Sequence, residues 1–319
     1  MFAYLVTQFK RSTRLFWSVA KVMLPVMVLV ELAQAAGLVD WVGRAIAPAM
    51  GLMHLPPEAG IVWATTVLVG IFGGIASLSA LAGTFDMTAA QLSALAAMML
   101  FAHALPVEQA IVRRAGASFW MTGALRLGTA ILYGAGVSWL CASFDLLSTP
   151  VSLEWLRGST FTQESSGITG WLMATGVSLG ITFTIIVVLV IILDALDRLG
   201  ITRRITAALT PVLRISGLSA DVAPVTTVGV LLGLTYGGAL IIEEAEKKNF
   251  PKRTRFLALS WLSLSHSLIE DTLLLVALGA DIWVVLVGRV VITLIIVAAL
   301  ARITNRGSWE RTAAESLPA

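Results

Sequence analysis

The sequence has little cysteine and little charge. Cys141 is the only cysteine in 319 residues, so the chain has no internal disulfide and no multi-cysteine zinc or iron–sulfur site of its own. Charged residues make up 13% of the chain, about half of the share found in a typical soluble domain. This composition argues against an ordinary soluble globular protein.

The sequence also lacks the common motifs of soluble enzymes. It contains no HExxH zinc motif, no Walker-type phosphate loop and no GxGxxG dinucleotide loop. One GxSxG pattern, GVSLG at 176–180, lies inside an apolar run rather than at a strand-to-helix turn, which argues against a serine hydrolase. Basic residues gather at the ends of apolar runs instead of forming one patch, so nothing indicates nucleic-acid binding. We expect no enzymatic activity and no cofactor.

Apolar residues, in contrast, are abundant. They make up 57% of the chain, and the mean hydropathy is +0.88. Runs of about 20 apolar residues, the length that spans a bilayer as a helix, recur along the sequence, for example at Trp171–Leu193 and Val284–Leu300. The N-terminal stretch has no cleavage site of the signal-peptide type, so we expect the whole chain in the mature protein. The sequence therefore predicts a polytopic membrane protein.

The chain carries an internal repeat. Sliding the sequence by 163 positions aligns, without a gap, residues that are rare in membrane helices. His103 falls on His266, although the chain has only three histidines. The other matched pairs include Glu108 with Asp271, Arg126 with Arg289, Gly70 with Gly233 and Gly74 with Gly237. Self-similarity at a fixed offset indicates duplication.

Each half reads as five helices. The predicted ranges are 15–36, 38–54, 59–82, 89–112 and 117–142, then 171–197, 201–216, 221–245, 255–278 and 281–303. Because five spans is an odd number, the halves must have opposite orientations, as in many secondary transporters. The fold prediction is an all-α polytopic membrane protein with about ten transmembrane helices in two inverted-topology five-helix repeats.

The domain organisation and topology follow from this repeat. The predicted segments are an N-terminal cytoplasmic segment 1–14, a first repeat 15–142, an extracytoplasmic linker 143–170, a second repeat 171–303 and a cytoplasmic tail 304–319. With both termini inside, most basic clusters lie on the cytoplasmic side, as the positive-inside rule requires. If the short helices 38–54 and 201–216 lay in the interface instead, several of these clusters would move outside. We therefore favour spanning helices, in a bacterial inner membrane.

The stretch LSHSLIEDTLLL carries the most unusual side chains. Ionisable groups in the hydrocarbon region cost about 2.5–3.5 kcal/mol each on insertion scales and are functional by default. In a continuous helix Glu270 shares a face with His266, and Ser265 and Ser267 flank the histidine. The repeat predicts that His103 lies at similar depth. We interpret these five residues as a site for a solute or a proton, since histidine titrates near neutral pH.

A divalent metal ion is an alternative ligand for the same place. Two histidines and one carboxylate, here His103, His266 and Glu270, form a common set of metal ligands. The residues alone do not decide between the metal, a proton relay and a hydrogen-bonded solute.

Arg126 and Arg289 lie inside the helices that follow Glu108 and Asp271. We predict two buried ion pairs, Glu108–Arg126 and Asp271–Arg289, that orient or gate the helices, because a lone buried charge is costly. Recognition of an anionic group by the two arginines is the alternative.

Two GxxxG patterns occupy matched positions, Gly70 with Gly74 and Gly233 with Gly237. Such small-residue patterns are typical of close helix packing in membranes. The alternative is that the glycines let the backbone approach a solute along its path.

The segments LPVEQAIVRRAGAS and SHSLIEDTLLLVALGAD, together with these glycines, resemble the nucleoside-recognition, or Gate, family of membrane proteins, over residues 20–140 and 175–303. The resemblance implies two inverted Gate units that form a transport core, as in concentrative nucleoside transporters, ferrous-iron transporter B proteins and spore-maturation membrane proteins. This chain differs from the iron transporters because it has no cysteines in the matching helices and no room for a G-protein domain.

The functional prediction is a secondary transporter, driven in one version by protons, with a midplane site between the repeats. The resemblance implies a small polar solute such as a nucleoside or a related metabolite. The alternatives are a divalent metal ion transporter and, from another class, a non-transporting membrane scaffold or a lipid-handling protein. The expected partners are the lipid bilayer and a small polar solute or ion, and the sequence is compatible with a homo-oligomer.

Overall fold

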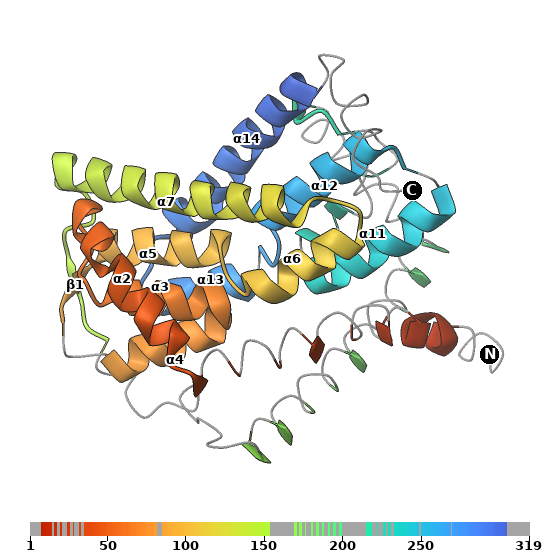
Figure 1. Cartoon of the computed structure of the whole chain (residues 1–319). Coiled ribbons are helices and arrows are strands. Elements are labelled where there is room, and N and C mark those ends of the chain that lie inside the picture. The colour runs from red at the N-terminus through yellow and green to blue at the C-terminus, as the bar shows by residue number, and fades with distance from the viewer. Residues whose placement is uncertain are drawn as a thin grey trace.

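The computed structural model covers the whole chain. It describes residues 8–14, 35–81, 85–153, 233–248, 250–268 and 270–304, and scattered positions within 16–32, 169–199 and 215–230. The predicted helices 15–36, 171–197 and 201–216 and much of the linker 143–170 lie largely outside the described residues. The described part is mainly helical (Figure 1). Its two short strands, β1 (Met87–Thr88) and β2 (Pro150–Val151), pair antiparallel.

The first half contributes six described helices. They are α2 (Leu38–Leu52), α3 (Ala59–Leu68), α4 (Ile71–Leu81), α5 (Ala89–Phe101), α6 (Leu105–Arg114) and α7 (Phe119–Phe144). Helix α5 begins with a capping box, in which Thr88 and Gln91 each accept a hydrogen bond from the other's backbone N–H. Helix α7 runs along α5, and α2 packs on α3 (Figure 1). Since nearly all of α5 is buried, this helix forms the centre of the described fold.

The second half contributes four α-helices and one π-helical segment to the described residues. They are α11 (Leu234–Lys248), α12 (Lys252–Leu264), α13 (Glu270–Ala277), the π-helical segment η3 (Trp283–Gly288) and α14 (Arg289–Thr304). Contacts between α11 and α6, between α12 and α7 and between η3 and α5 join the two halves. The halves therefore pack into one body at the level of α5, α6 and α12.

Several helices predicted as continuous are interrupted. The predicted helix 59–82 breaks at Gly70, 89–112 breaks at 102–104, and 255–278 breaks at 265–268. Glycine supplies the positive φ of 131° at Gly70 at no steric cost. The α5–α6 break is followed by Pro106 in the first turn of α6, where proline favours a helix start. Each of these predicted spans is thus a pair of shorter helices.

The left-handed backbone positions recur one repeat length apart. Gly70 and Gly233 have φ of 131° and 109°, and Ala104 and Ser267 have φ of 44° and 49°. His54 pairs in the same way with Gly217, and Gly116 with Gly279. The duplication seen in the residue types therefore has a counterpart in the backbone.

Three helices of the described residues are long and apolar enough to cross a membrane: Ala89–Arg114, which contains the α5–α6 break, Phe119–Phe144 and Trp283–Thr304. The first is largely buried, whereas the other two expose apolar side chains such as Trp120 (82% exposed) and Leu132 (77%). Exposed apolar faces of this size mark contact with another apolar medium. These helices identify a membrane protein that contacts the lipid bilayer.

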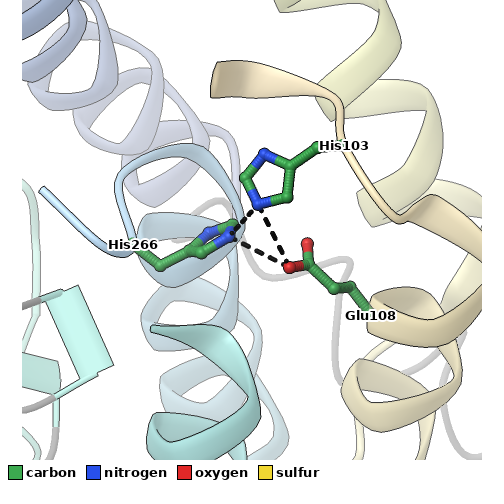
Figure 2. A group of neighbouring side chains, drawn as sticks. All are labelled: His103, Glu108 and His266. Atoms are coloured by element: carbon green, nitrogen blue, oxygen red, sulfur yellow. Dashed lines mark hydrogen bonds and ion pairs between the residues drawn. The ribbon is translucent and has the colours of Figure 1, made fainter. Parts of the chain in front are cut away.

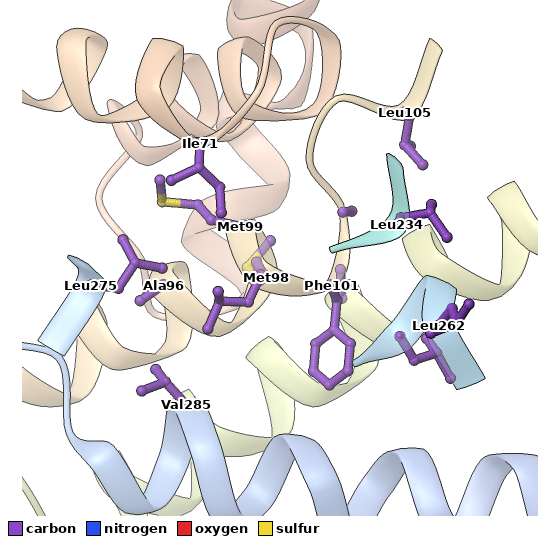
Figure 3. Packing of buried hydrophobic residues seen from close by; sticks show 14 of the residues in the cluster. Ile71, Ala96, Met98, Met99, Phe101, Leu105, Leu234, Leu262, Leu275 and Val285 are labelled. Atoms are coloured by element: carbon purple, nitrogen blue, oxygen red, sulfur yellow. The ribbon is translucent and has the colours of Figure 1, made fainter. Parts of the chain in front are cut away.

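The apolar core gathers around α5. Met98, Met99 and Phe101 point from this helix toward its neighbours (Figure 3). Among the residues packed in the same cluster are Ile71 of α4, Leu234 of α11, Leu262 of α12 and Val285 of η3. Methionine adapts to irregular gaps, and these contacts hold the interrupted helices of both halves in register at the point where the polar residues meet.

Candidate functional site

The two matched histidines lie in two matched helix breaks. His103 follows the end of α5 and His266 follows the end of α12. Their exposed fractions are 6% and 1%. Because both stand on non-helical backbone, their ring positions depend on the breaks and not on the face of a continuous helix.

The two rings meet edge to edge. The Nε2 atoms of His103 and His266 are 2.8 Å apart. The Nδ1 atom of His103 lies 3.0 Å from the carbonyl oxygen of Met99, and that of His266 lies 2.8 Å from the carbonyl oxygen of Leu262. A carbonyl oxygen only accepts, so each Nδ1 carries a hydrogen. In the neutral rings, both Nε2 atoms then present a lone pair toward the same point.

Glu108 completes a triangle with the histidines (Figure 2). It lies in the first turn of α6, and its Oε1 atom is 3.2 Å from Nε2 of His103 and 3.1 Å from Nε2 of His266. All three side chains are buried and come from both halves of the chain. We call His103, Glu108 and His266 the triad.

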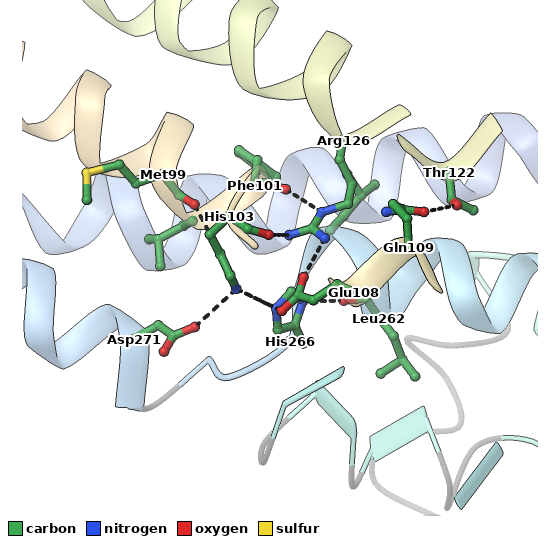
Figure 4. A network of polar contacts seen from close by, with 12 residues as sticks. Met99, Phe101, His103, Glu108, Gln109, Thr122, Arg126, Leu262, His266 and Asp271 are labelled. Atoms are coloured by element: carbon green, nitrogen blue, oxygen red, sulfur yellow. Dashed lines mark hydrogen bonds and ion pairs between the residues drawn. The ribbon is translucent and has the colours of Figure 1, made fainter. Parts of the chain in front are cut away.

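Arg126 of α7 holds Glu108 from the other side. Its Nη1 atom forms an ion pair with Oε2 of Glu108. Nε donates to the carbonyl oxygen of Phe101 at 2.8 Å, and Nη2 donates to that of His103 at 3.0 Å (Figure 4). These carbonyls lie at the end of α5, where a helix leaves its acceptors unsatisfied. The structure thus brings together Glu108 and Arg126, and the arginine also stabilises the helix break.

Arg289 repeats this arrangement only in part. Its Nε donates to the carbonyl oxygen of Leu264 at 2.9 Å, and its Nη2 donates to those of His266 at 3.0 Å and Leu100 at 3.1 Å. Its side chain is fully buried, and Nη1 has no hydrogen-bond partner among the described residues. Both N–H groups on Nη1 of this buried cation therefore have no acceptor in the described part of the chain.

The ion pair predicted between Asp271 and Arg289 is not formed, although the structure describes both residues. Oδ2 of Asp271 instead lies 3.8 Å from Nε2 of His103 (Figure 4). In this arrangement Arg289 donates instead to the backbone carbonyls of Leu264, His266 and Leu100. Asp271 is thus a second carboxylate beside the triad, at a longer distance from His103 than Glu108.

Glu270 does not accompany His266 as the four-residue spacing predicted. It is the first residue of α13, and its side chain is exposed. The chain leaves the helical path at 265–268, with φ of 49° at Ser267, so the face argument for a continuous helix fails. The carboxylate that reaches His266 is Glu108, from the other half. The proline just before it, Pro106, was the signal for a new helix there.

The remaining predicted positions have structural partners. The hydroxyl groups of Ser265 and Thr293 are 2.7 Å apart. Gly70 and Gly233 allow the left-handed turns before α4 and α11. A Cβ atom on Gly74 would overlap the side chain of Thr66, which fits the close-packing interpretation. Gly237 lies within α11.

A separate cavity of about 800 Å³ lies between α7 and α14. Its lining is mostly apolar and includes Leu132, Tyr133, Trp283 and Ile292. None of the triad residues lines it. Since α7 and α14 expose apolar faces, this cavity belongs to the outer surface of the described part and not to the triad.

Comparison with known proteins finds one family model and one related protein. Residues 16–118, which include His103 and Glu108, match the family model Gate, described as nucleoside recognition. The chain is 28% identical over 310 residues to the uncharacterized membrane protein YvoD of Bacillus subtilis, covering 93% of each chain. No solved structure matches.

Buried polar side chains at interrupted helices, on a scaffold with apolar outer helices, define a polytopic membrane protein with an internal polar site. The family comparison agrees with this class: residues 16–118 are similar to the Gate model, as the sequence resemblance predicted.

Proposed function

We propose that the protein is a secondary transporter whose two halves move against each other around the triad. The observation that carries this proposal is the 2.8 Å contact between Nε2 of His103 and Nε2 of His266, one residue from each half. The Gate family is associated with transport-related membrane proteins. Buried sites at discontinuous helices between repeated halves are typical of secondary transporters.

The proposal includes the arrangement predicted from the sequence. About ten spans form two inverted five-helix repeats, each a Gate unit, in a bacterial inner membrane with both termini in the cytoplasm. Its support is the recurrence of the left-handed positions, such as Ala104 and Ser267, one repeat length apart. We assign no catalytic step to the triad, because its arrangement supplies a binding site without a nucleophile.

The chemistry of the triad favours a cation. With both Nδ1 hydrogens committed to carbonyls, the converging atoms are two nitrogen lone pairs and one carboxylate oxygen. Such atoms attract positive charge and offer no donor to an anion or a ribose hydroxyl. The ion is then either the transported species or the ion that drives transport.

The equivalent carboxylates and arginines of the two halves make different contacts, and this difference supplies a mechanism for alternating access. Glu108 is paired with Arg126 and contacts both histidines, whereas Asp271 lies farther away and Nη1 of Arg289 has no partner among the described residues. In the opposite state Asp271 pairs with Arg289 and moves against the histidines while Glu108 withdraws. Two packings related by the repeat differ little in energy, as a two-state transporter requires.

A nucleoside solute is the second candidate. The observation in its favour is the description of the matching family as nucleoside recognition. In this version the cation at the triad is the coupling ion and the nucleoside binds beside it.

Transport by purified protein in liposomes tests the proposal. Uptake of candidate solutes should fall to the level of protein-free liposomes when His103 or His266 is replaced by asparagine. The matched control is His54→Asn, since His54 is the third histidine, is exposed, and has a left-handed φ of 55° that asparagine tolerates. Equal uptake by wild type and His266→Asn for every transported solute would contradict the proposal.

A further inference from the structure

The cation class at this site can be named from its geometry, in an inference that rests on the proposed function. We propose that Nε2 of His103, Nε2 of His266 and Oε1 of Glu108 bind one divalent transition-metal ion. Two imidazoles and one carboxylate are a recurring ligand set for zinc and for other first-row divalent ions.

The first step is the orientation of the imidazoles. In protein metal sites, a ligating histidine commonly donates its other ring N–H to a backbone carbonyl, which fixes the tautomer and turns the free nitrogen to the metal. Both histidines do this here, His103 toward Met99 and His266 toward Leu262. These contacts fix the orientation of both imidazole rings.

The second step is the convergence of the three ligand atoms. Two lone pairs and a carboxylate oxygen, separated by 2.8, 3.1 and 3.2 Å, repel one another unless a cation lies among them. A proton bridges one edge of this triangle, whereas a metal ion bonds to all three corners. The triangle therefore favours a metal ion over a proton.

The third step is size. A tetrahedral ion with bonds of about 2.0–2.1 Å holds its ligand atoms about 3.3 Å apart. The three observed edges are 0.1 to 0.5 Å shorter than this, so small side-chain rotations fit the ion without a change of backbone. Oδ2 of Asp271, 3.8 Å from Nε2 of His103, is placed to replace Oε1 of Glu108 as a ligand when the second half closes.

The fourth step is charge. Arg126 neutralises Glu108 through its other oxygen, and Arg289 adds a second buried cation nearby. These positive charges lower the affinity of the triad for a divalent ion, compared with the affinity of a closed structural metal site. Weak enough binding to release the ion is what a transport site needs. The only thiol, Cys141, is a residue of α7 outside the triad, so the site favours borderline ions over those that require sulfur.

Cobalt(II) is a direct probe, because its visible absorption changes on tetrahedral binding to nitrogen and oxygen. Metal-stripped full-length protein in detergent should bind one Co²⁺ per chain and develop this absorption, and Zn²⁺ should displace the Co²⁺. Glu108→Gln and His266→Asn should weaken binding at least about tenfold, while His54→Asn should bind as wild type. Circular dichroism of each variant shows whether it is folded.

The outcomes separate the two proposals. Absence of Co²⁺ and Zn²⁺ binding by the folded wild type, or binding that His266→Asn leaves unchanged, would overturn the metal site. If transport of another solute still depended on the triad, the proposed function would stand without the metal. If the metal bound at the triad but no solute crossed the membrane, the metal site would stand and the transport function would fall.

Discussion

His103 and His266 stand 163 positions apart in the chain, and their Nε2 atoms lie 2.8 Å apart in the fold. One comes from each half, and each is held by a carbonyl of the helix that precedes it. A cation bound between these two atoms would couple the positions of the two halves, because neither half could then move without opening the site. The predictions below concern the groups around this pair.

The first prediction separates two neighbouring carboxylates. Glu108→Gln removes the charge that contacts both histidines and should lower transport at least about tenfold. Glu270→Gln should leave transport near the wild-type rate, because Glu270 is exposed. Initial uptake rates in liposomes measure both. A larger loss in Glu270→Gln than in Glu108→Gln would restore the continuous-helix interpretation and contradict the structure.

The second prediction compares the two buried arginines. Arg126→Met strands the carboxylate of Glu108 and should cost about 3–5 kcal/mol of unfolding free energy. Arg289→Met leaves backbone carbonyls unsatisfied but strands no carboxylate, so its cost should be about 1–3 kcal/mol. Unfolding curves in detergent measure the difference.

A double variant provides the control for this comparison. Glu108→Gln should recover part of the stability lost in Arg126→Met, because the buried charge is then gone. Loss that is simply additive would show that the ion pair between Glu108 and Arg126 contributes nothing.

The third prediction concerns the exchange of carboxylates between states. Asp271 forms no ion pair with Arg289 in the described structure, and its Oδ2 atom lies 3.8 Å from Nε2 of His103. Asp271→Asn should therefore leave Co²⁺ binding within about threefold of wild type. The transport rate of this variant should fall about tenfold, because the closed second half loses the ion pair between Asp271 and Arg289. A tenfold change in rate corresponds to a change of about 1.4 kcal/mol in the activation free energy. If Asp271→Asn lowered Co²⁺ binding and transport by similar factors, Asp271 would instead be a metal ligand in the state described here.

The fourth prediction tests the close packing at Gly74. An added methyl group would overlap Thr66 and approach Met99, so Gly74→Ala should lower the free energy of unfolding by about 1–3 kcal/mol. Gly128→Ala, at a helical site in α7 with open space around it, should be neutral or stabilising by up to about 1 kcal/mol. If Gly74→Ala were as stable as Gly128→Ala, the overlap would be absent and the solute-path interpretation of this glycine would gain support.

Much of the site was accessible from the sequence because it depends on the repeat. Matching residue types at one offset placed His103 with His266, and a buried acid beside a buried arginine indicated Glu108 with Arg126. These inferences use only residue chemistry and the expectation that equivalent residues of the two repeats lie at similar depth in the membrane. They therefore do not depend on where a helix ends.

The interpretation of Glu270 assumed an unbroken helix. Glu270 shares a face with His266 only if the helix continues through Ser267, which has a left-handed φ of 49°. Neither Ser267 nor its counterpart Ala104 is glycine, so local composition does not signal the turn. The turns depend instead on tertiary contacts, such as the 3.0 Å hydrogen bond from the N–H of Ala104 to the carbonyl oxygen of Thr66.

Metal uptake into liposomes tests the central claim most directly. Purified wild type, His266→Asn and His54→Asn are reconstituted at equal density, and Zn²⁺ entry is followed with a dye inside the vesicles. The account predicts saturable uptake by wild type and His54→Asn and none above protein-free vesicles by His266→Asn. Uptake that is equal in wild type and His266→Asn, or absent in all three, would contradict the assignment of the triad as a transition-metal transport site.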